Sequence, residues 1–161
     1  MASSTKNQIS QPDKPETEPP VETAEEWYER WRKERDRMRL PTDAGDLTPA
    51  LESILRRIPD GWGRWISCEK GWYPIVVGVD QQLVELDPEY VVHQVKEKFG
   101  GLRYYFQPSD AVSDEACRQM RQVVRDAEAE AWKHCETCGT TTGVVLLEDR
   151  AHHQTLCSDC A

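Results

Sequence analysis

The C-terminal part of the fold is decided by residues 135–160, which read CETCGTTTGVVLLEDRAHHQTLCSDC. Two Cys-x-x-Cys pairs lie in this stretch, Cys135 with Cys138 and Cys157 with Cys160, and 18 residues separate the pairs. Two cysteines three positions apart on a tight turn can direct both sulfurs at one ion, and four thiolates satisfy the tetrahedral preference of zinc. The spacing therefore predicts a zinc ribbon over residues 135–161, with structural Zn²⁺ held by all four cysteines.

Other uses of these cysteines fit the pattern less well. Two disulfides would need an oxidising compartment, and the polar N-terminal residues have no apolar segment typical of a secretory signal. A redox Cys-x-x-Cys is normally single, and a catalytic zinc needs a position open to water, which four cysteines close. His134, His152 and His153 lie beside the pairs and could replace one cysteine, although four cysteines already suffice.

Length and composition bound the rest of the molecule. The chain has 161 residues, of which 38% are hydrophobic and 30% are charged, enough for one modest domain plus an appendage. No run approaches the roughly 18 apolar residues of a membrane span, and we expect a cytoplasmic protein.

The formal net charge of −9 is unfavourable for sequence-independent binding to DNA or RNA, which depends on neutralising phosphates. Residues 135–161 contain four acidic residues against Arg150 alone. Four thiolates on one zinc add about two further negative charges. We therefore expect the ribbon to act as a structural clip or a protein-docking surface.

The N-terminal part divides into a tail and a helix. Residues 1–21 are polar and rich in proline, and we expect a disordered tail because so little apolar surface cannot offset the entropy of ordering. Residues 22–44 are predicted to form a charged helix and linker, starting at Thr23 with a capping box. Trp27 and Trp31 share one helical face, which is typical of packing on the protein's own core; the alternative is an arm that binds a partner.

Residues 45–134 are expected to form an α+β core. Apolar residues at helical spacing predict three helices, at residues 48–57, 74–86 and 110–133. Thr48 and Ser113 are the expected N-caps of the first and the third. The fold class is therefore α+β: a small helical domain with a β-hairpin, a long helix and the C-terminal zinc ribbon.

The hairpin is predicted from residues 90–98 and 102–106, which are rich in β-branched and aromatic residues. The turn is assigned to Gly100-Gly101. Strict alternation along the first strand would place Val92 and Val95 on opposite faces. A two-stranded hairpin is marginal alone, so it must pack on the helices.

Aromatic residues are densest over residues 61–74, where Trp62, Trp65, Trp72 and Tyr73 are separated by glycines. Tryptophan and tyrosine combine a large apolar area with one polar group, so such a cluster marks either a core or a binding surface. We interpret these four residues as part of a docking surface.

The hairpin combines the basic residues Lys96, Lys98 and Arg103 with aromatic ones, among them Tyr105. One interpretation is a nucleic-acid surface, with rings stacked on bases and cations on phosphates. The other is a hairpin with one buried face and one basic exposed face. The second is favoured, because residues 58–108 hold five basic and seven acidic residues and so have no basic excess.

Catalytic candidates are few. His93 and Cys68 could form a nucleophile pair only with a geometry that the sequence does not supply. A strand histidine is usually structural, and Cys68 and Cys117 are typical of small buried residues. No phosphate loop, nucleophile elbow or paired-histidine metallohydrolase motif is present, so the chain is not expected to be an enzyme.

Residues 71–74, GWYP, and residues 94–105, QVKEKFGGLRYY, resemble a family of small proteins from tailed bacteriophages and prophages. The similarity extends from about Trp62 to Cys138 and includes the Glu-Ala-Trp…Cys-x-x-Cys-Gly segment at the end of the long helix. The resemblance implies a phage-encoded protein that acts in the host cytoplasm, and it implies no established activity.

These observations together predict a non-enzymatic accessory protein that binds a host or phage protein and carries structural zinc. Inhibition of a host nucleic-acid enzyme is one form of this prediction, since carboxylates of an acidic protein can occupy positions meant for phosphates. The alternative is a nucleic-acid-binding regulator that uses the hairpin face formed by Lys96, Lys98 and Arg103.

Overall fold

A three-stranded sheet lies at the centre of this computed structural model, which describes residues 21–148 and 151–161. The strand order is β1-β2-β3. The short β1 (Ile66–Ser67) runs parallel to β2 (Val91–Lys98), which pairs antiparallel with β3 (Gly101–Gln107). Residues 1–20 of the expected disordered tail lie outside the described residues.

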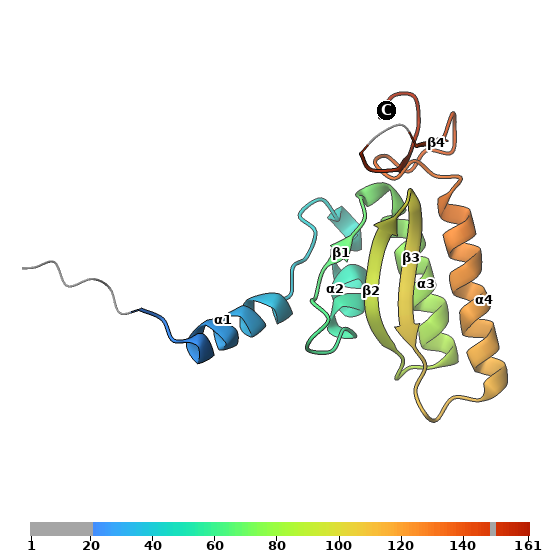
Figure 1. Ribbon diagram of the computed structural model, residues 1–161. Coiled ribbons are helices and arrows are strands. Elements are labelled where there is room, and N and C mark those ends of the chain that lie inside the picture. Colours follow the sequence, from blue (N-terminus) through green and yellow to red (C-terminus); the bar gives the residue numbers. More distant parts are fainter. Residues whose placement is uncertain (1–20, 149–150) are drawn as a thin grey trace, which may run out of the picture.

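Helices cover one face of this sheet. α3 (Tyr73–Leu86) and α4 (Asp114–Ala131) lie behind β2 and β3, and α2 (Thr48–Arg56) packs against α3 (Figure 1). The opposite face carries no helix of the described chain in this view, and we call it the open face. The expected α+β class, with a hairpin that packs on helices, is confirmed.

The core fills the space between the sheet and the helices. Its fully buried side chains include Trp72, Tyr90, Leu51, Ile54, Leu55, Ile58, Leu83, Leu102, Met120, Val76, Val79 and Val92. The expected apolar stripe of α2 is therefore buried. None of the described helices is long and apolar enough to cross a membrane.

The helix starts follow local capping rules, with one correction. Thr23 caps α1 (Ala24–Asp36) in a complete capping box, and Ser113 caps α4. Thr48 is not the N-cap of α2, because a 3₁₀ turn, η1 (Gly45–Leu47), leads directly into the helix. The Thr48 hydroxyl instead donates to the Gly45 carbonyl at 2.7 Å.

The expected strict alternation along β2 is wrong. The pairing shifts between Val92 and Gln94, so His93 is an extra residue in a β-bulge. Val92 and Val95 consequently both face the core, three positions apart, and both are fully buried. His93 itself is directed to the open face, where its ring meets Trp62.

The hairpin turn is one residue earlier than expected. Lys98 pairs with Gly101, which leaves Phe99 and Gly100 as the two turn residues. Their φ angles are +54° and +81°, as a type I′ turn requires at both positions. Gly100 adopts this conformation without strain, whereas a phenylalanine rarely does.

Helix α1 does not pack on the core. None of its residues is buried, and Figure 1 shows it projecting from the body. Trp27 is 50% exposed and Trp31 is 42% exposed. The expectation that the two tryptophans face the protein's own core is therefore wrong for the described chain.

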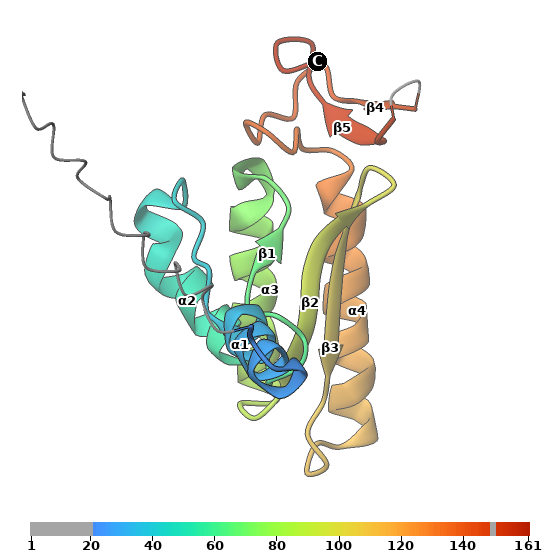
Figure 2. The ribbon, with the colours of Figure 1, turned by 60° about the vertical axis from the view of Figure 1, so that its left-hand side comes forward.

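The C-terminal segment forms a pair of short strands. β4 (Val145–Leu147) pairs antiparallel with β5 (Gln154–Leu156). Figure 2 shows this unit above the tip of the β2–β3 hairpin and the C-terminal end of α4. The ribbon, residues 135–161, therefore lies at one end of the sheet.

Candidate metal centre and open sheet face

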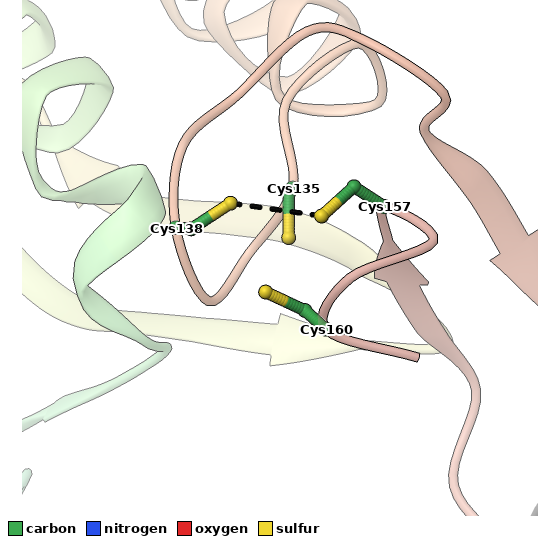
Figure 3. Close-up of side chains that lie close together, drawn as sticks. All are labelled: Cys135, Cys138, Cys157 and Cys160. Carbon is green, nitrogen blue, oxygen red and sulfur yellow. Dashed lines mark hydrogen bonds between the residues drawn. The ribbon is translucent and has the colours of Figure 1, made fainter.

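The four ribbon cysteines come together in space. Their sulfur atoms lie within 4.8 Å of one another, and the sulfurs of Cys138 and Cys157 are 3.7 Å apart. Figure 3 shows the side chains converging from two turns. Zinc–sulfur bonds of about 2.3 Å at tetrahedral angles separate neighbouring sulfurs by about 3.8 Å, so the cluster can hold one metal ion.

Backbone amides prepare this cluster for a cation. Burial opposes ionisation of the Cys135 thiol, but backbone N–H groups of Cys157 and Cys138 are directed at its sulfur and lower its pKa to about 6. The adjacent Cys157 thiol raises the pKa of Cys160 to about 12. The Cys135 thiol thus ionises readily and the Cys160 thiol does not, because two thiolates this close repel each other. A bound cation would offset this repulsion and allow both thiols to ionise.

No histidine belongs to the cluster among the described residues. The Nδ1 atom of His134 lies 3.1 Å from the Glu130 carbonyl in the last turn of α4. The ring of His153 faces Phe99 at a centroid distance of 6.1 Å. Four sulfur ligands close the coordination sphere, so the chemistry open to this centre is structural.

The first cysteine turn is docked on the start of α3. The Gly71 amide donates to the Glu136 carbonyl at 2.7 Å, and the buried Trp72 indole donates to the His134 carbonyl at 3.0 Å. A Cβ on Gly71 would lie 2.6 Å from the Gly139 amide nitrogen and nearer still to two carbonyl oxygens. Gly71 is therefore required for the backbones to approach this closely.

The second point of attachment is the hairpin tip. The Thr155 hydroxyl donates to the Gly100 carbonyl at 2.6 Å. A side chain at Gly100 would collide with Leu146, and a Cβ on Gly101 would lie 2.5 Å from the Trp132 ring. The ribbon therefore holds the start of α3, the hairpin tip and the end of α4 together.

Glu136 is a site residue that the sequence did not reveal. It stands between two cysteines in a polar stretch, yet it is 3% exposed. Its Oε1 accepts from the Glu69 amide at 3.3 Å, and burial raises its pKa to about 7. Its position depends on a contact with a residue 67 positions away in the chain, which no local pattern signals.

The expected docking residues separate into two groups. Trp72 is fully buried and Tyr73 is 5% exposed, so both belong to the core and their assignment to a docking surface is wrong. Gly71, the residue before Trp72, permits the close backbone packing against the ribbon. Trp62 is 52% exposed, and Trp65 is half-buried beneath the Arg39 guanidinium, which lies 5.4 Å from its ring centroid.

The remaining expected residues gather on the open face. Lys96 lies directly opposite Arg103 across the hairpin, and Gln94 lies opposite Tyr105, so these four side chains share one face. Among the described residues, neither cation forms an ion pair with a carboxylate. Like charges directly opposite each other destabilise a ladder. The Arg103 guanidinium donates to the Leu102 carbonyl at 2.7 Å, but no carboxylate of the described residues neutralises either charge, so this pair is an uncompensated positive site.

A cleft lies beside this pair. It has a volume of about 280 Å³ and is lined by Trp62, His93, Gln94, Lys96 and Tyr105. The rings of Trp62 and His93 are stacked in parallel, with centroids 4.3 Å apart and 7° between their planes. The bulge in β2 thus places the His93 ring against the exposed ring of Trp62. Large rings beside unpaired cations suit a partner that is both apolar and anionic.

The possible nucleophile pair gains no support. Burial raises the pKa of the Cys68 thiol well above its usual range, and the carboxylates of Glu136, Glu69 and Asp43 add to the shift. An activated cysteine needs the opposite shift. His93 has its ring stacked on Trp62 at the open face.

No family model matches the chain, and neither a curated protein nor a solved structure matches it.

Proposed function

We propose that the protein is a non-enzymatic binding protein that carries one structural zinc and docks an acidic segment of a partner protein on its open face. The observation that carries the proposal is the uncompensated pair of Lys96 and Arg103 beside the exposed rings of Trp62 and Tyr105. Trp, Tyr and Arg are the residue types that dominate the energetics of protein interfaces. A carboxylate placed between the two cations would remove a repulsion as well as add an attraction.

Zinc is the metal that best suits the cluster. Four cysteines in two Cys-x-x-Cys pairs form the ligand set of structural zinc sites, and soft thiolates disfavour calcium and magnesium. The ion would hold both cysteine turns, and through them the hairpin tip. Its role in binding is therefore to stabilise the shape of the open face, since no cysteine of the cluster lines the cleft.

The resemblance to phage proteins supports a setting in the cytoplasm of an infected bacterium. Reduced thiols are the norm there, as a four-thiolate site requires. The partner would be a host or phage protein, and an inhibitory role is consistent with the net charge of −9.

A second candidate is single-stranded nucleic acid on the same face. The stacked pair of Trp62 and His93 favours it, because bases stack on such rings while phosphates meet Lys96 and Arg103. The net charge disfavours it, since a polyanion is repelled at long range. A protein segment with a few carboxylates meets less repulsion, and we therefore favour the protein partner.

The test is a capture experiment from infected cells with the tagged, zinc-loaded full chain. We expect one partner to be lost with Lys96→Glu/Arg103→Glu and with Trp62→Ala/Tyr105→Ala. Tyr28→Ala is the matched control, since Tyr28 is 45% exposed and Tyr105 is 41% exposed, and it should leave capture unchanged. Cross-links from the open face should fall in an acidic segment of that partner. A partner captured equally well by all the variants would refute docking at this face.

Binding to a labelled single-stranded oligonucleotide at several salt concentrations separates the two candidates. Tight binding that weakens steeply with salt, and is lost in the charge-reversed variant, would establish the nucleic-acid candidate instead. The metal is tested separately by elemental analysis, which should find one zinc per chain. Chelation or Cys157→Ser should lower the melting temperature, and a metal-free protein indifferent to chelator would refute the zinc.

A further inference from the structure

Helix α1 has an apolar face that nothing in the described chain covers. Trp27, Tyr28 and Trp31 are each between 42% and 50% exposed. The rings form a ladder, with centroids 6.3 Å apart for Trp27–Trp31 and 5.8 Å apart for Tyr28–Trp31. A helix of 13 residues is marginally stable in water without tertiary packing. This arm therefore needs a surface to lie on.

The arm is rigidly attached at its C-terminal end. The Gly61 amide donates to the Asp36 carboxylate at 2.9 Å, and the Arg64 guanidinium donates to the Asp36 carbonyl at 2.9 Å. Asp36 also forms an ion pair with Arg35 at 2.8 Å. These bonds fix the direction in which α1 leaves the body, and Figure 1 shows α1 on the side opposite α4.

A groove of about 530 Å³ lies on the other side of the molecule, between α3 and α4. It is lined by Ile75, Gly78, Val79, Gln82, Gln119, Gln122, Val123, Asp126, Ala127 and Glu130. Gly78 is one of the lining residues, and a Cβ built there would have no atom within 4 Å. Alanine at this position would make the helix more stable, so the glycine is there at a cost. The open space above Gly78 that this cost maintains indicates that another element lies there.

The groove and the arm each have a charged side chain of opposite sign that forms no ion pair among the described residues, Asp126 and Arg32. The carboxylates of Asp126 and Glu130 line the groove. On the arm, the Arg32 guanidinium lies 4.4 Å from the Tyr28 ring centroid and that of Arg35 lies 4.8 Å from the Trp31 centroid. Arg35 is already paired with Asp36 and Glu130 with Lys133, so Arg32 is the cation beside the aromatic ladder that would meet the Asp126 carboxylate. An amphipathic helix laid in an apolar groove is a common mode of recognition.

We propose that two copies of this chain exchange arms, so that α1 of each copy lies in the α3–α4 groove of the other. The pinned Asp36 keeps the arm away from its own groove, whereas a second copy related by a two-fold axis presents its groove to the arm. Such an interface is closed and uses the same two surfaces twice. It leaves the open face of each copy free, so the pair would present two docking faces. The inference is independent of the proposed function.

The test is the molar mass of the zinc-loaded full chain by light scattering and sedimentation over a range of concentrations. We expect twice the 18.5 kDa of one chain. Trp27→Ala/Trp31→Ala removes the ladder from an exposed surface, and it should raise the dissociation constant about 100-fold or more. Trp62→Ala is the control, since this tryptophan is 52% exposed on another face and should not affect the mass.

The groove is tested by Gly78→Gln, which fills the space without disturbing the helix. It should give a monomer that melts no lower than the Trp27→Ala/Trp31→Ala variant. Mixing these two monomeric variants should restore association, because one intact arm then meets one intact groove. A monomer at all concentrations would overturn the proposal. So would a dimer that Gly78→Gln leaves intact, because the arms would then be pairing with each other.

Discussion

Replacing Gly71 by alanine should separate the ribbon from the core. Gly71 does not have a positive φ, so alanine is compatible with its backbone and any effect is steric. The new Cβ would lie 2.6 Å from the Gly139 nitrogen, whereas ordinary contacts begin at 3.4 Å. The obstacles are backbone atoms of the first cysteine turn, which cannot rotate away. That turn must therefore move outward by about 1 Å, an overpacking strain that typically costs about 1–3 kcal/mol.

This movement would break the bond from the Gly71 amide to the Glu136 carbonyl. It would also stretch the bond from the Trp72 indole to the His134 carbonyl, and that indole is fully buried. Each lost bond contributes about 1 kcal/mol, and a buried donor left unpaired costs about 1–3 kcal/mol. We expect Gly71→Ala to lower the free energy of unfolding by about 2–4 kcal/mol, a large part of a typical total of about 5–15 kcal/mol.

The assay is denaturant unfolding of the zinc-loaded protein, together with the rate at which a chelator removes the zinc. Gly78→Ala in the Trp27→Ala/Trp31→Ala background, where no arm occupies the groove, is the matched control, because this helical glycine has no atom within 4 Å of its Cβ position and alanine should stabilise the helix by about 0.5–1 kcal/mol. Gly71→Ala should also release zinc faster. Wild-type unfolding and wild-type zinc release in Gly71→Ala would refute the tight apposition of ribbon and core.

Two further predictions concern the sheet. Tyr90→Phe should lower the unfolding free energy by about 1–3 kcal/mol in thermal melts, because the buried Tyr90 hydroxyl donates to Asp80 and lies 2.9 Å from the Tyr104 hydroxyl. Burial raises the pKa of both tyrosines. Their contribution to stability is therefore complete below about pH 10, the pKa of an unfolded tyrosine, and falls as the pH rises further. A loss of stability above about pH 10 that is as large in Tyr90→Phe as in wild type would contradict this. Phe99→Asn should raise the unfolding free energy by about 0.5–1 kcal/mol, because asparagine tolerates the φ of +54° that Phe99 adopts. A lower melting temperature in Phe99→Asn would show instead that the exposed ring makes stabilising contacts.

The elements that sequence reasoning located correctly are those that depend on near neighbours. The Cys-x-x-Cys spacing brings four sulfurs together because each turn is local and the two pairs need only meet once. The capping box at Thr23 and the stripe of Leu51, Ile54 and Leu55 likewise need only three or four residues to be recognised. The α+β class followed from these patterns.

The errors came from contacts between distant segments. The assignment of Trp72 and Tyr73 to a surface is wrong because a glycine-rich aromatic stretch fits a core as well as a surface. The contact that decides for the core is the hydrogen bond from Trp72 to His134, 62 positions away in the chain. The bulge at His93 places Val92 and Val95 on the same face, and alternation gives no sign of an inserted residue. Helix α1 has an amphipathic pattern that does not say which molecule covers it.

The cysteine cluster lies at the end of the sheet where the hairpin is weakest. Lys96 and Arg103 repel each other across the ladder, and Phe99 holds a strained turn conformation at the tip. A hairpin with both defects would fray from the tip inward if nothing held it. The ribbon supplies that restraint through the bond from Thr155 to Gly100, and its own few buried residues, centred on Cys135, Leu156 and Cys157, are too small a core to fold without cross-linking. A metal bound by the four cysteines would therefore stabilise the end of the sheet near which Lys96 and Arg103 repel each other, and it would do so without occupying the open face.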